Sequence, residues 1–192
     1  MDTGLAHRLS QTLTERQPQT RTEWEARPAA VILPLYHHEG SWWLLFTRRA
    51  ELLAEHSGQV AFPGGRIDAG ETAEQAALRE IEEEIGIQAS EVTILGQLDP
   101  LLTVTQFLIH PVVAEIRWPT RLILNPAEVA RVFGVPLQWL DEAANLERHE
   151  RQSPFSARPV QVYTFKRFDG EQIWGATARL TVQLLATLES AE

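Results

Sequence analysis

The sequence predicts an α/β domain with a mixed β-sheet, and three observations support this prediction. Apolar segments rich in β-branched and aromatic residues alternate with segments whose apolar residues have helical spacing. The chain has 192 residues, which is long enough for one domain with a substantial core. Its 44% hydrophobic content is ordinary for a globular protein. Interleaved strands and helices in this order favour a mixed sheet.

The polar N-terminal segment, residues 1–27, is expected to be partly helical, because LAHRLSQTL can form a short amphipathic helix. The domain itself is expected to span residues 28–192. It begins with two strands, PAAVILPLYH and GSWWLLFTRR, which the turn residues His38, Glu39 and Gly40 join as a hairpin. Further strands are expected at 92–98, 108–118 and 133–136, and a C-terminal helix at 177–188.

The stretch TAEQAALREIEEEIG predicts a helix over about residues 73–85. Thr72 followed three residues later by Gln75 is a capping-box pattern, and Gly86 is a natural residue just beyond a helix end. The helical period then predicts that Leu78, Ile81 and Ile85 face the core, with Ala77 at the edge of that face.

Composition excludes several classes of function. Cysteine is absent, which excludes disulfides, cysteine nucleophiles and thiolate zinc sites. A net charge of −9 argues against a general nucleic-acid binder, although a small polyanionic substrate fits if cations bridge it to the protein. No apolar run is long enough to span a membrane, and the N-terminus lacks the apolar core of a signal peptide. We therefore expect a cytoplasmic protein without a membrane partner.

One face of the predicted helix is acidic, because Glu80, Glu83 and Glu84 fall on a single arc while Glu82 points away. Like charges four residues apart destabilise a helix by about 0.2–0.5 kcal/mol per pair. The face could be a solvated surface with incidental clustering. However, the preceding FPGG loop can bring backbone oxygens close to it, and hard oxygen donors suit Mg²⁺ or Mn²⁺. A bound cation would convert the mutual repulsion into shared attraction.

The stretch GRIDAGETAEQAALREIEEEIGI resembles the signature of the Nudix hydrolases. The resemblance implies an α/β/α sandwich, with the signature as a loop-helix-loop, and hydrolysis of a nucleoside diphosphate linked to another group. It also implies roles for individual residues. The implied metal ligands are Glu80, Glu83 and Glu84 with the carbonyl of Gly64, and the implied supporting residues are Glu71, Arg79, Gly65 and Gly86.

The upstream stretch LLFTRRAELLAEHSGQVAFPGG is similar to the coenzyme A pyrophosphatase subgroup of that family. It matches at Thr47, Arg49, Ala50, Gly58 and the FPGG loop, and it departs at Ala54, where the subgroup usually has arginine. The resemblance implies cleavage of coenzyme A or its derivatives to 3′,5′-ADP and 4′-phosphopantetheine. The substrate-binding candidates are Arg48, Arg49 and His56.

The implied mechanism is metal-assisted attack of water on a phosphorus atom. Glu83 is the expected base because it lies between Glu80 and Glu84 in angle, and Glu80 and Arg79 complete the catalytic candidates. Glu128 is a further acidic candidate, or an ordinary solvated residue. Two alternatives stay open: a Nudix hydrolase for another nucleotide such as ADP-ribose, and a non-catalytic nucleotide sensor. The oligomeric state is also open, with a homodimer as one option.

Overall fold

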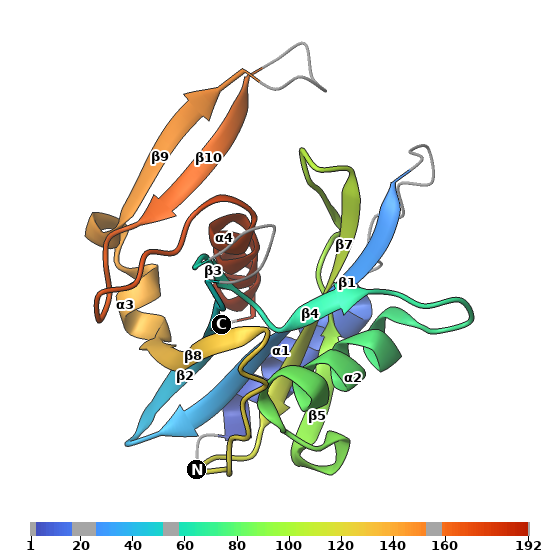
Figure 1. Ribbon diagram of the computed structural model, residues 1–192. Coiled ribbons are helices and arrows are strands. Elements are labelled where there is room, and N and C mark those ends of the chain that lie inside the picture. Colours follow the sequence, from blue (N-terminus) through green and yellow to red (C-terminus); the bar gives the residue numbers. More distant parts are fainter. Residues whose placement is uncertain (1–2, 17–25, 52–57, 153–158, 192) are drawn as a thin grey trace.

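The structure is a computed structural model that describes residues 3–16, 26–51, 58–152 and 159–191 (Figure 1). The helices are α1 (Thr3–Glu15), α2 (Ala73–Ile85), α3 (Leu137–Asp141) and α4 (Gly175–Glu189), with short 3₁₀ turns at Ala89–Glu91 and Ala143–Asn145. The strands are β1 (Arg27–His38), β2 (Ser41–Arg49), β3 (Val60–Ala61), β4 (Gly64–Arg66), β5 (Val92–Gln97), β6 (Leu101–Leu102), β7 (Phe107–Ile116), β8 (Val129–Pro136), β9 (Leu146–Arg151) and β10 (Val160–Phe165).

Eight of the strands form one mixed sheet, as the sequence predicts. Its main order is β3-β2-β1-β7-β5, with β4 paired to β1, β6 to β7 and β8 to β2. β1 and β7 run parallel, and the other pairs are antiparallel. The predicted hairpin is confirmed: β1 and β2 pair up to His38 opposite Ser41, and Glu39 and Gly40 both have positive φ, as a two-residue hairpin turn of type I′ requires.

Helices cover both faces of this sheet, which makes the molecule an α/β/α sandwich. Side chains alternate along β1, so that Leu33 and Leu35 pack with residues of α1 and α4, whereas Ile32 packs with residues of α2. Helix α1 buries Leu9 and Leu13 completely or almost completely in the first of these clusters. The helix expected near the N-terminus therefore contributes to the core, while the division of the chain at residues 27 and 28 stays a prediction.

Two features differ from the sequence-based expectation. β9 and β10 form a separate two-stranded sheet that projects from the rest of the molecule and that was not predicted from the sequence (Figure 1). On α2 the buried apolar residues are Ala76, Ala77, Ile81 and Ile85. Leu78 is only half-buried, so its placement in the core was wrong. None of the helices within the described ranges combines the length and the apolar character needed to cross a membrane.

Candidate functional site

Local interactions fix where α2 begins and ends. The backbone N–H of Gln75 donates to Thr72 Oγ1 at 3.2 Å, and the backbone N–H of Thr72 donates to Gln75 Oε1 at 2.8 Å. Gly86 has a φ of 78° and donates its N–H to the Glu82 carbonyl at 2.9 Å. The predicted capping box and C-terminal glycine are thus confirmed. The two ends of the helix are therefore set by its own sequence.

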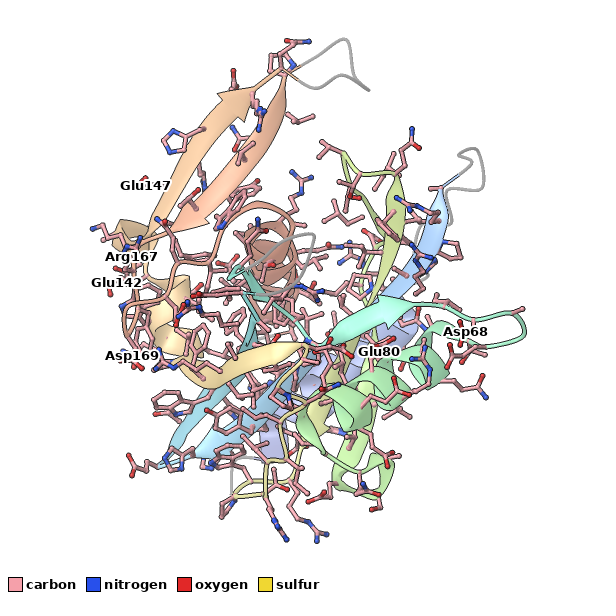
Figure 2. All side chains as sticks on the ribbon, viewed as in Figure 1. Asp68, Glu80, Glu142, Glu147, Arg167 and Asp169 are labelled. Atoms are coloured by element: carbon pink, nitrogen blue, oxygen red, sulfur yellow. The ribbon has the colours of Figure 1, made fainter. Side chains whose placement is uncertain are left out.

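Three carboxylates meet beside the C-terminal half of α2, and we call them the acid cluster: Glu80, Glu84 and Glu128. Each contributes an oxygen that lies within 4.8 Å of the other two. Glu84 is buried, with 3% of its surface exposed, and the N–H of Gly64 approaches its Oε1 at 3.5 Å. Figure 2 labels Glu80 on α2, below β4. Glu128 arrives from the loop before β8, where Asn125 Nδ2 donates to its Oε1 at 3.1 Å.

The electrostatics of the acid cluster favour a cation. Burial raises the pKa of Glu84 to about 8, an effect that the N–H of Gly64 opposes and the charges of Glu80 and Glu128 reinforce. Burial also raises the pKa of Glu80, although a hydrogen bond from Arg79 acts in the other direction. Three close carboxylates with so few donors repel one another when ionised. The oxygen-only ligand set therefore fits a hard divalent cation, which would take the place of the retained proton.

Arg79 holds the neighbouring carboxylates in place. Its Nε and Nη2 donate to the two oxygens of Glu71, both at 3.0 Å, in a bidentate pair. Its Nη1 donates to Glu80 at 2.7 Å and to Glu83 at 3.2 Å, and Nη2 also reaches the carbonyl of Arg66 at 3.0 Å. The hydrogen bond from Arg79 is the largest of the effects that lower the pKa of Glu71. One guanidinium thus ties the loop before α2 to the acidic face of the helix.

Glu83 lies outside the acid cluster. Its side chain is 56% exposed, and its contact is with Arg79. The structure therefore brings together Glu80, Glu84 and Glu128 rather than the three helical glutamates, and the catalytic role of Glu83 stays a prediction. Glu82 is exposed and accepts a hydrogen bond from Gln88 at 3.0 Å, in agreement with its expected solvated position.

The two glycines of the FPGG loop have no room for side chains. A Cβ at residue 64 would lie 2.7 Å from the Cα of Val31, because β4 pairs closely with β1 there. A Cβ at residue 65 would overlap the carboxylate of Glu80. The loop can approach the acid cluster only because both residues are glycine.

These contacts predict different outcomes for the two glycines. Gly65→Ala should displace the flexible Glu80 carboxylate and lower kcat by about 100-fold, since misplacement by about 1 Å is enough for such a loss. The free energy of unfolding should fall by only about 1 kcal/mol. Gly64→Ala should instead destabilise the protein by more than about 3 kcal/mol, because backbone must move. Steady-state kinetics and urea unfolding check both effects; equal loss of stability in the two variants would contradict this explanation.

The substrate-binding candidates are placed differently. Arg49 lies near the acid cluster, where its charge lowers the pKa of Glu84. Its Nε is buried and, among the described residues, has no hydrogen-bond partner. Arg48 instead bonds Glu51 at 2.6 Å and lies 3.8 Å from Glu171. His56 and Ala54 lie outside the described residues.

The raised pKa of Glu84 predicts that the metal-free protein loses stability as pH rises. The ordinary pKa is 4.5 and the folded value is about 8, so between these values the folded state binds more protons than the unfolded state. Stability conferred by the retained proton is complete below the lower value and gone above the higher one. We expect the melting temperature of metal-free protein to fall from about pH 5 to about pH 8, and Mg²⁺ to restore it mainly at the higher pH.

Calorimetry at both pH values, with chelator or with Mg²⁺, measures this dependence. Glu84→Gln should flatten the pH dependence and remove most of the Mg²⁺ effect. Glu82→Gln, on the exposed side of the same helix, should leave both unchanged. A wild-type melting temperature that rises with pH in the absence of metal would contradict the assignment.

Comparisons with known proteins agree with this geometry. The Nudix domain model matches residues 25–158. An uncharacterized Nudix hydrolase from Photorhabdus laumondii, NudL, is 40% identical over 169 residues, which cover 87% of this chain and 88% of the relative. The solved structure of RenU, a Nudix hydrolase from M. smegmatis, is 26% identical, with a TM-score of 0.52 over 60% of this chain and 73% of that one.

A MutT/nudix family protein from Enterococcus faecalis matches 98% of this chain and 71% of its own, with a TM-score of 0.56. Its identity is 14%, so this likeness concerns the fold alone. The family model and NudL each cover well over half of the chain and include the FPGG loop and α2. The chain therefore belongs to the Nudix domain family, as a pyrophosphatase of the Nudix hydrolase type.

Proposed function

We propose that this Nudix hydrolase, which acts on nucleoside diphosphate derivatives, cleaves the diphosphate bond of coenzyme A or a derivative. The products are 3′,5′-ADP and 4′-phosphopantetheine. One observation carries the proposal: the stretch similar to the coenzyme A pyrophosphatase subgroup borders the acid cluster. Within this stretch the N–H of Ala50 donates to the carbonyl of Glu128 at 2.8 Å, and the charge of Arg49 lowers the pKa of Glu84. The stretch that resembles the coenzyme A pyrophosphatases is therefore adjacent to the carboxylates of the acid cluster.

We assign Mg²⁺ or Mn²⁺ as the cation. Glu80, Glu83, Glu84 and the carbonyl of Gly64 are the proposed ligands, and the closeness of Glu128 to Glu80 and Glu84 supports adding it to this set. When bound, the cation would neutralise the charge of the diphosphate and lower the pKa of a coordinated water.

The protein side chains then orient the reactants and move the proton. Glu83 accepts the proton of the attacking water, a task that suits its position on the exposed edge of the acidic face. Arg79 and Glu71 hold Glu80 in place. Arg49 has a buried Nε without a partner among the described residues, and it would donate to a substrate phosphate oxygen. Arg48 and His56 are the other proposed substrate contacts.

The proposed base and the added ligand predict two distinguishable variants. Glu83→Gln should lower kcat by about 100-fold, the lower end of the range for a general base. It should reduce the Mg²⁺-dependent rise in melting temperature less than Glu128→Gln does, because Glu83 lies outside the acid cluster. Glu128→Gln should reduce that rise and increase the Mg²⁺ concentration needed for half-maximal activity. Metal titrations of activity and of melting temperature separate the two. If Glu128→Gln lost kcat at saturating Mg²⁺ while keeping metal affinity, the two roles would have to be exchanged.

Hydrolysis of a small panel tests the substrate: coenzyme A, ADP-ribose, a dinucleoside polyphosphate and a nucleoside triphosphate, each with Mg²⁺ or Mn²⁺. Metal-dependent release of 3′,5′-ADP from coenzyme A, lost in Glu84→Gln, is the expected result. If another member of the panel is hydrolysed in preference, the substrate is a different nucleotide. Ala54 keeps this alternative open, because the subgroup usually has arginine at that position. Binding without turnover would indicate a sensor, although Glu80, Glu83 and Glu84 are all present.

The same proposal includes a cytoplasmic location, a small-molecule substrate rather than nucleic acid or membrane, and a homodimer as the assembly to test. Sedimentation of the purified chain decides between monomer and dimer.

A further inference from the structure

A cavity lies at the end of β2, lined by Arg48, whose neighbour Arg49 is close to the acid cluster. It has a volume of about 480 Å³, within the size range of small-molecule sites. It lies among β2, β3, β8 and the segment that connects β10 to α4. Side chains of Arg48, Arg131, Arg167, Glu171 and Trp174 line it. Arg48 lines this cavity, while the charge of the next residue, Arg49, lowers the pKa of Glu84 in the acid cluster.

The cavity contains an unusual arrangement of positive charge. Arg48 and Arg131 are directly opposite each other in the antiparallel pairing of β2 with β8. Like charges at opposed positions destabilise a sheet. Glu171, with 11% of its side chain exposed, offsets part of this repulsion: it lies 3.0 Å from Arg131 and 3.8 Å from Arg48. One carboxylate thus holds two guanidinium groups toward the same space.

Arg167 adds a third positive charge at the rim. It donates to the carbonyl of Gly170 at 2.8 Å, and none of the carboxylates within the described residues pairs with it. Asp169 pairs with Arg131. Figure 2 labels Arg167 and Asp169 near α3, on the segment that connects β10 to α4 in the chain. The lining therefore holds three positive and two negative side chains in a protein whose net charge is −9.

An exposed aromatic ring completes the cavity. Trp174 is 46% exposed, although large apolar side chains are usually buried. Its backbone is fixed by pairing with Thr164, and the N–H of Phe165 donates to the carbonyl of Ile173 at 2.8 Å. Trp174 also precedes α4, whose first turn has neither a side-chain cap nor an acidic residue. Positive charge and an exposed ring thus line one space, and α4 begins directly after that ring.

We propose that this cavity binds the nucleotide end of the substrate, with the base stacked on Trp174 and a phosphate monoester on the sugar held by Arg167 and Arg48. This inference rests on the proposed function, since it names the part of the substrate that the cavity recognises. In this arrangement the diphosphate binds at the acid cluster with its cation, and the cavity binds a different phosphate, the monoester on the sugar. A flat ring beside guanidinium groups suits a nucleotide, because bases stack on aromatic side chains and phosphates bind arginine.

Equilibrium binding of the product nucleotide tests the inference without requiring turnover. Calorimetry compares 3′,5′-ADP with 5′-AMP, which lacks the second phosphate. We expect 3′,5′-ADP to bind at least about tenfold more tightly, as for a charge-assisted contact. Arg167→Ala should remove most of this difference. Lys166→Ala is the matched control, because Lys166 is the exposed neighbouring cation and does not line the cavity.

Trp174→Ala should weaken the binding of both nucleotides by about fivefold or more, and Trp174→Phe, which keeps a ring, should restore most of the affinity. Melting curves check that each variant is folded. Equal affinity for the two nucleotides, an Arg167→Ala variant that keeps the difference, or unchanged binding in Trp174→Ala would each overturn the proposal. If the predicted binding pattern appears but coenzyme A is not hydrolysed, the cavity assignment stands and the proposed function fails. If coenzyme A is cleaved without this pattern, the reverse holds.

Discussion

Glu84→Gln should lower metal-dependent kcat by about a thousandfold or more. Glu84 is the most buried member of the acid cluster, and its proposed role is to bind the cation. Metal ions stabilise transition-state charge by several kcal/mol, and each 1.36 kcal/mol corresponds to about tenfold in rate. Glutamine has nearly the same shape but cannot carry the negative charge. It resembles the protonated carboxyl that burial favours in the metal-free protein, so the fold should be retained.

Turnover at saturating Mg²⁺, together with melting curves, measures this effect. Glu82→Gln is the matched control, since it makes the same chemical change on the solvent side of α2 and should retain nearly full activity. A Glu84→Gln variant with more than about a tenth of wild-type kcat would rule out Glu84 as an essential metal ligand. The other proposed ligands would then have to hold the cation without it.

Arg79→Ala should lower stability and activity together. Arg79 bonds Glu71, Glu80 and Glu83, and the first two carboxylates are only 15% and 12% exposed. Removing the guanidinium leaves them close together without their shared partner. Hydrogen bonds to charged groups contribute about 1.5–3 kcal/mol each, so we expect the free energy of unfolding to fall by about 3 kcal/mol after allowance for solvent. Activity should also fall by about 100-fold, because Glu80 loses its orientation.

Urea unfolding and steady-state kinetics measure the two losses. Arg79→Lys should recover little activity, because an ammonium group cannot reproduce the bidentate pair with Glu71. Arg8→Ala, which removes an exposed arginine from α1, should change neither property. Full activity in Arg79→Lys would show that only the charge of Arg79 matters and would contradict the proposed positioning role.

The parts of the structure that depend on local chemistry could be predicted from the sequence. The boundaries of α2 follow from Thr72, Gln75 and Gly86, whose capping interactions need no tertiary partner. The β1–β2 hairpin follows from turn residues between two apolar runs. Glu80 and Glu84 were identified because helical spacing places them on one arc. These predictions involve residues close together in the sequence, where geometry is set by the helical or strand period.

The remainder depends on contacts between distant segments. Glu128 lies 44 residues after Glu84 and approaches it because β8 pairs with β2, a pairing that no local pattern specifies. Leu78 was wrongly placed in the core because α2 presents its small residues, Ala76 and Ala77, to the sheet. The cavity was missed for the same reason: Arg48, Arg131 and Trp174 come from three regions of the chain, and each alone is unremarkable in sequence.

The pair of adjacent arginines at the end of β2 has a consequence for how this enzyme can diversify. Arg48 lines the cavity, and the next residue, Arg49, lies near the acid cluster. The proposed site for binding the nucleotide and the proposed site for cleaving the diphosphate are therefore served by adjacent residues. Changes around the cavity can alter which molecule is accepted while the reactive centre keeps its geometry. Related enzymes could therefore acquire new substrates by mutating the segment between β10 and α4, and a protein engineer could redesign selectivity there without touching the chemistry.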